Sequence, residues 1–262
     1  MPAETDKKDS ARSAIILLGV VIVVAGLTVF YGLQTLTYAE AKSWARTDPW
    51  LNDVPQALPP PAPLPDFSKM KDKPEELKTN VWEFRVPWKG EPKQRTLPTA
   101  IEYRFDSGQV VDFFDPQAQS DSLGEFKKLS PLAYQRFSNV FQGNEPQNNY
   151  ELYRDVYSAA PSQMSPVMTQ ADALRLNVLV IWKIGFGFDA QPGIHSFDWP
   201  NARGFEFGDA SKGGPVALRV FDARDHQFRF LFVVAAGTHG TFTQDDIDFV
   251  IQTLQPIPFE ER

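Results

Sequence analysis

Residues 217–237 read ALRVFDARDHQFRFLFVVAAG, and this stretch decides the fold. From position 227 to 236, phenylalanine and valine recur at every second residue, which is the period of a β-strand with two distinct faces. The loop at 222–226 is short enough to join this strand to its predecessor at 216–221 as an antiparallel neighbour. We therefore expect an antiparallel sheet in the C-terminal third of the chain.

The next stretch, FTQDDIDFVIQTLQPI at residues 242–257, predicts an amphipathic helix that lies across this sheet. Thr243 is a typical N-cap residue, Asp246 stands three positions after it, and Pro256 ends the pattern. The acidic residues at 245–248 complement the positive end of the helix dipole, so we interpret them as capping groups. A calcium loop would need ligands around a central glycine, which this stretch lacks.

Patterns of the same two kinds fill the preceding part of the chain. Alternating apolar residues predict a strand at 81–86 and a hairpin at 100–115 around the turn residues 106–108. Helical spacing follows at 122–129, 130–141, 149–159 and 169–186, and a further short strand at 205–207. This order predicts an α+β domain, in which an antiparallel sheet is packed against helices that cover mainly one of its faces.

The helix at 169–186 is apolar on almost every side, which raises the alternative of a second membrane span. Its longest uninterrupted apolar run, at 178–182, is far shorter than the roughly 20 residues that a span requires. Arg175, Asn177 and Lys183 also interrupt the apolar pattern. We therefore expect a mostly buried helix within the globular domain.

The hairpin at 217–237 and the capped helix at 242–257 together resemble the closing β-β-α unit of the PsbP/Mog1-like α+β domains. The resemblance rests on pattern and covers about a quarter of the chain. The order of elements is similar as well, although the helical block at 122–186 is longer than in that family. The resemblance implies a non-enzymatic accessory or interaction role, and no site residue is carried over from it.

An uncharged stretch, AIILLGVVIVVAGLTVFYGL at residues 14–33, precedes the domain. At 1.5 Å per residue, about 20 apolar residues span the roughly 30 Å of a bilayer's hydrocarbon core. We predict an N-terminal tail at 1–12 and one transmembrane helix at 13–36. A signal peptide cleaved near Ala41 is the alternative, although the apolar core of a signal is normally about 7–15 residues long.

The distribution of basic residues around this span predicts its orientation. Lys7, Lys8 and Arg12 precede the span, whereas only Lys42 and Arg46 follow it closely. By the positive-inside rule, this favours a cytoplasmic N-terminus. We therefore expect a single-pass protein of the cell membrane whose C-terminal domain lies outside the cytoplasm.

Residues 37–80 are predicted to be a juxtamembrane and proline-rich linker, and the globular domain is expected at 81–258. Six of the eleven residues at 55–65 are proline, and each proline removes a backbone donor and fixes φ. In polyproline geometry such a stretch reaches roughly 34 Å. We interpret it as a stiff spacer that holds the domain clear of the headgroups, the alternative being a docking ligand for an aromatic groove.

The sequence contains no familiar catalytic, cofactor or metal motif. There are no cysteines, which excludes thiol catalysis and cysteine-based metal sites. His195, His226 and His239 are spaced so that no two share one face of an element. We therefore predict neither a metal nor a cofactor. The net charge of −7 argues against nucleic acid as a partner, because binding it requires a basic face.

Aromatic residues make up 13% of the chain, and some of them are candidates for lining a groove. Trp82, Trp88, Phe197 and Trp199 are the candidate binding residues for a partner or an apolar ligand. The leading hypothesis is a single-pass, envelope-exposed binding or scaffolding module without catalytic activity. Its expected partners are the membrane and other membrane or envelope proteins.

Two other functions stay open at this point. A lipid- or small-ligand-binding domain would need a closed apolar pocket between the helix at 169–186 and the sheet. A hydrolase lacking a standard motif would need carboxylates that converge in a cleft, such as Asp112 with Asp115 or Glu206 with Asp209.

Overall fold

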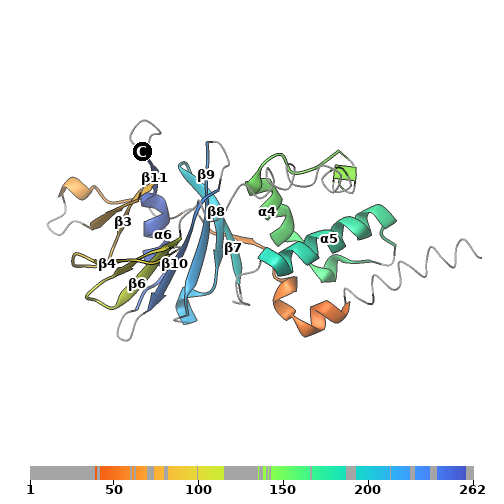
Figure 1. The fold of residues 1–262 in the computed structure, drawn as a ribbon, viewed down its shortest axis with the longest axis horizontal. Coiled ribbons are helices and arrows are strands. Elements are labelled where there is room, and N and C mark those ends of the chain that lie inside the picture. Colours follow the sequence, from red (N-terminus) through yellow and green to blue (C-terminus); the bar gives the residue numbers. More distant parts are fainter. Residues whose placement is uncertain are drawn as a thin grey trace, which may run out of the picture.

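An eight-stranded sheet forms the centre of the computed structural model, in the order β1-β7-β8-β9-β10-β6-β5-β4 (Figure 1). The structure describes residues 42–114, 143–186, 193–236 and 241–257, apart from gaps at 60, 62, 70–73, 80–81, 99, 166, 213 and 225–227, and also residues 39, 135, 138, 139 and 141. All neighbouring strands in this sheet are antiparallel except β1 and β7, which are parallel. The described part of the chain is therefore a mixed α+β fold built on antiparallel sheets and helices.

The strands of this large sheet come from both halves of the chain. They are β1 (Gln56–Ala57), β4 (Lys93–Thr96), β5 (Ala100–Arg104), β6 (Gln109–Phe114), β7 (Ile194–Asp198), β8 (Ala202–Phe207), β9 (Val216–Asp222) and β10 (Phe228–Ala236). A second sheet of three strands, in the order β11-β3-β2, consists of β2 (Glu75–Lys78), β3 (Trp82–Val86) and β11 (Gln255–Pro256). The helices are α4 (Asn149–Ser158), α5 (Gln170–Phe186) and α6 (Gln244–Thr253), with short 3₁₀ turns η1 (Pro49–Asn52), η2 (Phe67–Lys69), η4 (Pro161–Gln163) and η5 (Ala210–Lys212).

The structure confirms the two hairpins and the final helix that the sequence predicts. β5 pairs antiparallel with β6 across the turn at 106–108, and β9 pairs antiparallel with β10. At the start of α6 the Thr243 amide donates to a carboxylate oxygen of Asp246 at 2.8 Å, while the Asp246 amide donates to Thr243 Oγ1 at 3.3 Å. This reciprocal capping box fixes where the helix begins.

Both faces of the central strands are covered, which corrects the prediction that the helices lie mainly on one face. Every residue of β9 is buried, so neither of its faces meets solvent. On one side lie α4 and α5, and on the other lie α6 and the three-stranded sheet (Figure 1). The correction follows from composition, because β9 carries apolar side chains on both of its faces: Val216, Leu218 and Val220 on one, and Ala217 and Phe221 on the other. Both rows must be buried.

The tyrosine stripe of α4 joins the helical layer to the sheet. Tyr150 stacks on Phe205 with ring centroids 5.6 Å apart, and Tyr157 meets Phe207 edge to face at 5.0 Å. Such aromatic pairs add about 0.5–1.5 kcal/mol each beyond the area that they bury. The helix predicted at 149–159 is thus held against β8 and β9 by the face that carries its tyrosines.

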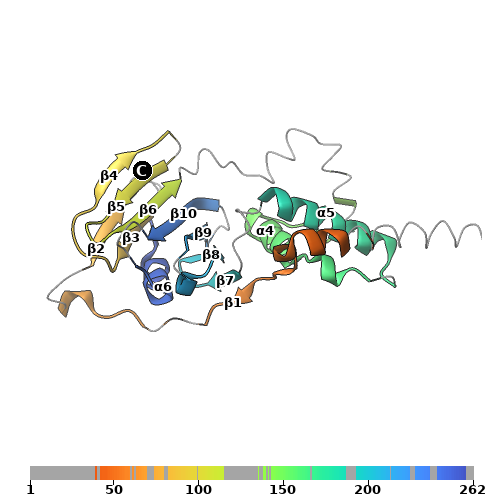
Figure 2. The ribbon, with the colours of Figure 1, turned by 90° about the horizontal axis from the view of Figure 1, so that it is seen from below.

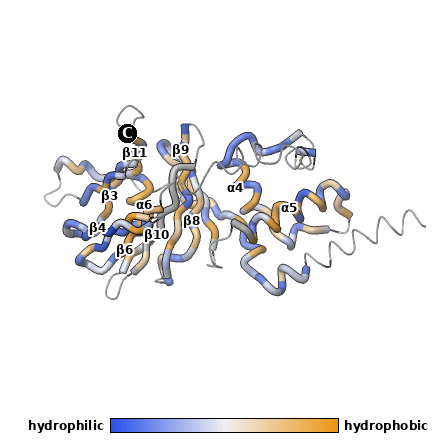
Figure 3. The backbone as a smooth tube through the Cα atoms, viewed as in Figure 1, coloured by the Kyte–Doolittle hydropathy of each residue, from blue (hydrophilic) through white to orange (hydrophobic). Residues whose placement is uncertain are grey.

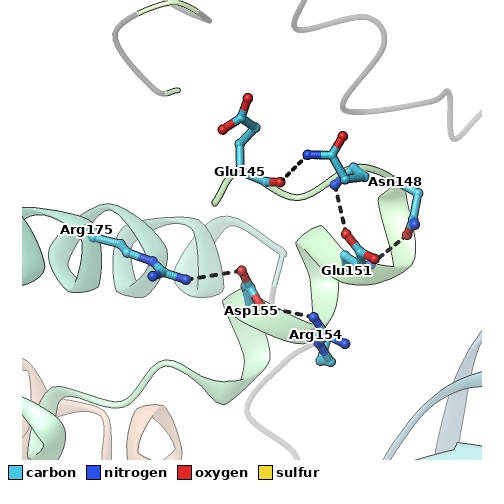
Figure 4. A network of polar contacts seen from close by, with 7 residues as sticks. Glu145, Asn148, Glu151, Arg154, Asp155 and Arg175 are labelled. Carbon is cyan, nitrogen blue, oxygen red and sulfur yellow. Dashed lines mark hydrogen bonds and ion pairs between the residues drawn. The ribbon is translucent and has the colours of Figure 1, made fainter. Parts of the chain in front are cut away.

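Polar contacts fix the start of α4 and its attachment to α5 (Figure 4). The side chain of Asn148 accepts a hydrogen bond from the amide of Glu151 at 2.9 Å, as an N-cap residue does. Farther along the helix, Asp155 lies 3.4 Å from a guanidinium nitrogen of Arg175 on α5. Because these pairs are partly exposed, they contribute little to the stability of the fold. Their main effect is to fix the positions of the two helices.

The segment predicted as a linker takes part in the fold, so the domain begins well before residue 81. β1 pairs with β7, β2 pairs with β3, and Leu51 is fully buried. Figure 2 shows the segment running along the molecule from the α5 end toward β2 and β3. The proline-rich stretch at 55–65 is therefore a strap across the domain and not a spacer beneath it, because Leu58 and Leu64 have apolar surface to bury.

Lys183 holds the segment just before this strap, in and beside η1, to the helices through a fully buried ammonium group. Its Nζ donates to the carbonyls of Leu51 at 3.1 Å, Tyr157 at 3.0 Å and Ala159 at 2.9 Å, and also to the carbonyl of Asp53. Burial lowers the pKa of Lys183 to about 8, and the nearby Asp53 opposes this shift. One side chain thus satisfies carbonyls at the end of α4 and in and beside η1.

Gly204 on β8 is required by close packing against β9. A Cβ atom added there would lie 2.1 Å from the carbonyl oxygen of Arg219 and 2.7 Å from the ring of Phe197. We expect Gly204→Ala to lower the free energy of unfolding by about 2 kcal/mol, measured by urea denaturation. Gly90→Ala is the control, because a Cβ atom at that position would meet no atom within 4 Å. Its φ of +93° is unfavourable for alanine, so we expect the free energy of unfolding to fall by only about 1 kcal/mol. Equal stability of Gly204→Ala and the unchanged chain would contradict this packing.

The predicted tail at 1–12 and transmembrane helix at 13–36 lie outside the described residues, as does nearly all of the helical region predicted at 122–141. Within the described ranges, no helix has the length and hydropathy needed to cross a bilayer.

Candidate functional site

An open apolar groove of about 610 Å³ lies between the proline-rich strap and the turn that joins β7 to β8. Its apolar lining comes from the strap, from this turn and from the end of α6: Leu58, Pro61, Leu64, Phe197, Trp199, Pro200 and Ile251. Polar groups are few, and among the described lining residues Asp198 is the only carboxylate. A site of this kind suits apolar contact with a ligand or peptide better than proton transfer.

The strand β7 and its turn place the aromatic side of the groove. Phe197 is buried among the residues between the large sheet and α6, and Trp199 packs against it with ring centroids 5.3 Å apart. The amide of Trp199 donates to the carbonyl of Ala202 at 3.0 Å, which closes the turn around Pro200. Because both rings are held by rigid elements, this side of the groove is formed in advance of binding.

The strap forms the opposite side and is fixed at one end by the sheet. The amide of Leu58 donates to the carbonyl of Ser196 at 2.9 Å, in continuation of the pairing between β1 and β7. The residues that follow, at 59–61, are all proline and carry no backbone donor. This is the physical reason that β1 ends after two residues and leaves the outer edge of β7 beyond Ser196 without a described strand beside it.

The structure brings together two of the four candidate binding residues. Phe197 and Trp199 both line the groove, although Phe197 is only 2% exposed. Trp82 and Trp88 lie elsewhere, in the core between the two sheets, where Trp88 meets Phe105 edge to face at 5.3 Å. Trp82 lies on β3, whose residues can face core or solvent, and Trp88 lies just beyond the end of this strand; both side chains are buried in the core.

Sequence reasoning missed the leucines of the strap as groove residues. The signal was present, since Leu58 and Leu64 are the large aliphatic residues within the proline-rich stretch. Large aliphatic side chains are unfavourable in a solvated spacer, whereas a strap that packs on a domain can bury them.

A second feature is a buried polar cluster beneath the first turn of α6. Glu206 is fully buried, and one of its carboxylate oxygens accepts from Gln244 Nε2 at 3.0 Å. The same Nε2 donates to Asp248 at 3.0 Å, so one amide bridges two carboxyl groups. His195 stands directly opposite Glu206 in the pairing of β7 with β8. Among the described residues, Glu206 Oε1 and His195 Nδ1 have no hydrogen-bond partner.

Burial dominates the acid-base properties of this cluster. It raises the pKa of Glu206 to about 7, with the nearby Asp248 acting in the same direction and the hydrogen bond from Gln244 against it. Burial likewise raises the pKa of Asp248. None of these side chains lines the groove beside Trp199, so the cluster is a packed ionisable group and not part of that site.

Of the two carboxylate pairs weighed for a hydrolase, only Glu206 with Asp209 lies entirely within the described residues, and these two carboxylates bind different partners. Asp209 binds Ser211 and Lys212, whereas Glu206 binds Gln244. Asp112 stands opposite Glu102, and its pKa is raised mainly by burial, while Asp115 lies outside the described residues. His226 and His239 also lie outside them. Within the part of the chain that the structure describes, no three histidine or acidic side chains gather as metal ligands.

Comparison with known proteins adds no relative to this description. No protein family, curated protein or solved structure matches the chain.

Proposed function

We propose that the chain is a single-pass, membrane-anchored binding module whose groove beside Trp199 takes an extended apolar segment of another envelope protein. In this proposal residues 13–36 cross the cell membrane with the N-terminus in the cytoplasm, and the domain lies outside. The uncharged stretch at 14–33 supports the anchor. The apolar, preformed groove is the observation that carries the binding role.

The strand edge beside the groove favours an extended occupant. Within the described residues, β1 pairs with β7 only at Gln56 with His195 and Ala57 with Ser196. An extended peptide could therefore continue along β7 and use main-chain hydrogen bonds there, while its side chains enter the groove. Trp199 would act as the aromatic anchor, since a few such residues usually supply most of the binding energy.

The competing ligand-binding hypothesis is less well supported. It requires a closed apolar pocket between α5 and the sheet, but there the described apolar residues form a packed cluster with the tyrosines of α4. The resemblance of β9, β10 and α6 to the PsbP/Mog1-like domains also implies an interaction role without catalysis. A non-enzymatic binding module accommodates all of these observations.

Site-specific photocrosslinking in native membranes tests the proposal. A benzoylphenylalanine at Asn201, which is exposed and lines the groove, is expected to give one discrete protein adduct. Trp199→Ala should weaken that adduct by about tenfold, the effect of losing one modest hot spot. The matched control places the same probe at Gln94, which is exposed on β4, and should give no such adduct.

The outcomes separate the candidate functions. A lipid or small-molecule adduct at Asn201 would show that the groove binds an apolar ligand and not a peptide segment. Equal adducts at Asn201 and Gln94, or an adduct at Asn201 that is insensitive to Trp199→Ala, would contradict binding in the groove.

A further inference from the structure

Helix α5 carries an exposed apolar face on the side away from its packed residues. Leu174, Ile181 and Ile184 are 51%, 52% and 47% exposed. Their spacing of seven and three residues sets them along one side of the helix, with the half-buried Val178 between them. The prediction of a mostly buried helix is therefore correct for only one face of α5. Figure 3 shows that apolar residues occur along much of the length of α5.

An exposed apolar face of this kind indicates a binding surface. Single exposed aliphatic residues are common on soluble domains, but several on one helix face form the kind of patch that marks an interaction surface. Opposite them, Leu176 and Val180 are buried in the cluster that α5 shares with α4. The helix thus has one apolar face packed against its own domain and a second one directed outward.

The path of the chain identifies the bilayer as the occupant. Lys42 follows the end of the predicted span at position 36 by only six positions, and a fully extended chain covers about 20 Å over that length. Helical residues 42–47 follow, and Trp44 packs into the cluster of α4 and α5. Lys183, in the last turn of α5, then donates a hydrogen bond to the carbonyl of Leu51. An anchored chain must therefore hold α5 near the membrane surface.

The residues near this end of the domain suit a lipid interface. Lys42 and Arg46 are exposed where the chain enters the fold, and basic side chains at that depth lie among headgroup phosphates. Trp182 is half-buried next to Ile181, and tryptophan is enriched at membrane interfaces. In both Figure 1 and Figure 2, β4 lies at the opposite end of the molecule from α5.

We infer that the exposed face of α5 inserts into the interfacial region of the same bilayer that holds the anchor. This inference rests on the proposed membrane anchoring. The exposed aliphatic side chains Leu174, Ile181 and Ile184 would lie at the boundary of headgroups and acyl chains, about 5–10 Å deep, as in other interfacial amphipathic helices. The contact fixes the tilt of the domain and directs β4 away from the membrane.

Fluorescence of the full-length chain in phosphatidylcholine vesicles tests the inference. Because the chain has no cysteine, Ile181→Cys gives a single site for an environment-sensitive nitrobenzoxadiazole label. Lys93→Cys on β4, whose original side chain is 82% exposed, is the matched control. We expect a doxyl-labelled phosphatidylcholine to quench the label at position 181 about threefold, as for a probe at interfacial depth, and to leave the label at 93 unchanged.

Flotation after an alkaline wash distinguishes failure of the inference from failure of the anchor. Release of the protein from the vesicles would overturn both. Retention of the protein with equal, weak quenching at 181 and 93 would overturn the α5 contact and leave the anchor standing. A third outcome is a label at 181 that is shielded from water but not quenched by the doxyl lipid, with shielding that increases with the density of protein in the vesicles. This outcome would assign the exposed face of α5 to a second copy of the chain and would likewise overturn the inference.

Discussion

Lys183→Met is expected to lower the free energy of unfolding by about 3–5 kcal/mol, because several buried carbonyls lose their donor and each unsatisfied buried acceptor costs about 1–3 kcal/mol. Methionine has a similar length but donates no hydrogen bond. The carbonyls of Leu51, Tyr157 and Ala159 would lose their contact with the ammonium group. Urea denaturation of the full chain in detergent micelles measures the loss.

The control for this variant is Arg175→Met, which removes a cation from the same helix. The Arg175 side chain is 36% exposed in its pair with Asp155, so we expect a loss below about 1 kcal/mol. Hydrogen exchange adds a local test, because amides at 48–53 should exchange faster in Lys183→Met than in Arg175→Met. Equal unfolding midpoints for the two variants would show that the ammonium contacts do not hold η1 against the helices.

Glu206→Gln is expected to remove a pH dependence of stability that the unchanged chain possesses. The folded state holds the carboxyl proton up to a pKa of about 7, whereas an ordinary glutamate has a pKa of 4.5. Between these values the unfolded chain binds fewer protons than the folded chain, so stability falls as pH rises. The difference of about 2.5 pH units corresponds to roughly 3 kcal/mol.

The glutamine variant should therefore gain about 3 kcal/mol relative to the unchanged chain between pH 4.5 and pH 8. The amide copies the shape of the protonated carboxyl and can still accept from Gln244 through its oxygen. Urea midpoints across this range measure the change. Asp209→Asn is the matched control, because hydrogen bonds from Ser211 and Lys212 lower the pKa of Asp209 and its contribution is lost as pH falls. A constant difference between Glu206→Gln and the unchanged chain at all pH values would show that Glu206 does not titrate in this way.

Local pattern predicted the elements whose burial alternates regularly. β3 and β6 alternate buried with partly buried residues, and α6 carries its capping residues in its own sequence. β4 has four exposed residues and no apolar period, so only its pairing with β5 reveals it as a strand. β1 and β2 were not predicted, because prolines and charged residues surround them. They form strands only through pairing with β7 and β3.

The candidate site was predicted in part, and the missing part depends on contacts distant in sequence. Phe197 and Trp199 are two residues apart, so their meeting is local. Leu58 joins them only through pairing of the strap with β7. Glu206 and Gln244 are 38 residues apart and Lys183 is 132 residues from Leu51. No sequence period relates such positions, and an ionisable residue inside an apolar pattern gives no sign of which carbonyl or amide will meet it.

The ammonium group of Lys183 has a mechanical consequence. Tension transmitted along the chain from residues 42–47 reaches η1 before it reaches the two-residue strand β1, and there it meets contacts with Leu51, Tyr157 and Ala159 that join three separate segments. Load is therefore passed to α4 and α5 as a unit. The hydrogen bonds between β1 and β7 lie downstream of this junction, so the groove wall that they support is shielded from a pull on the N-terminal side.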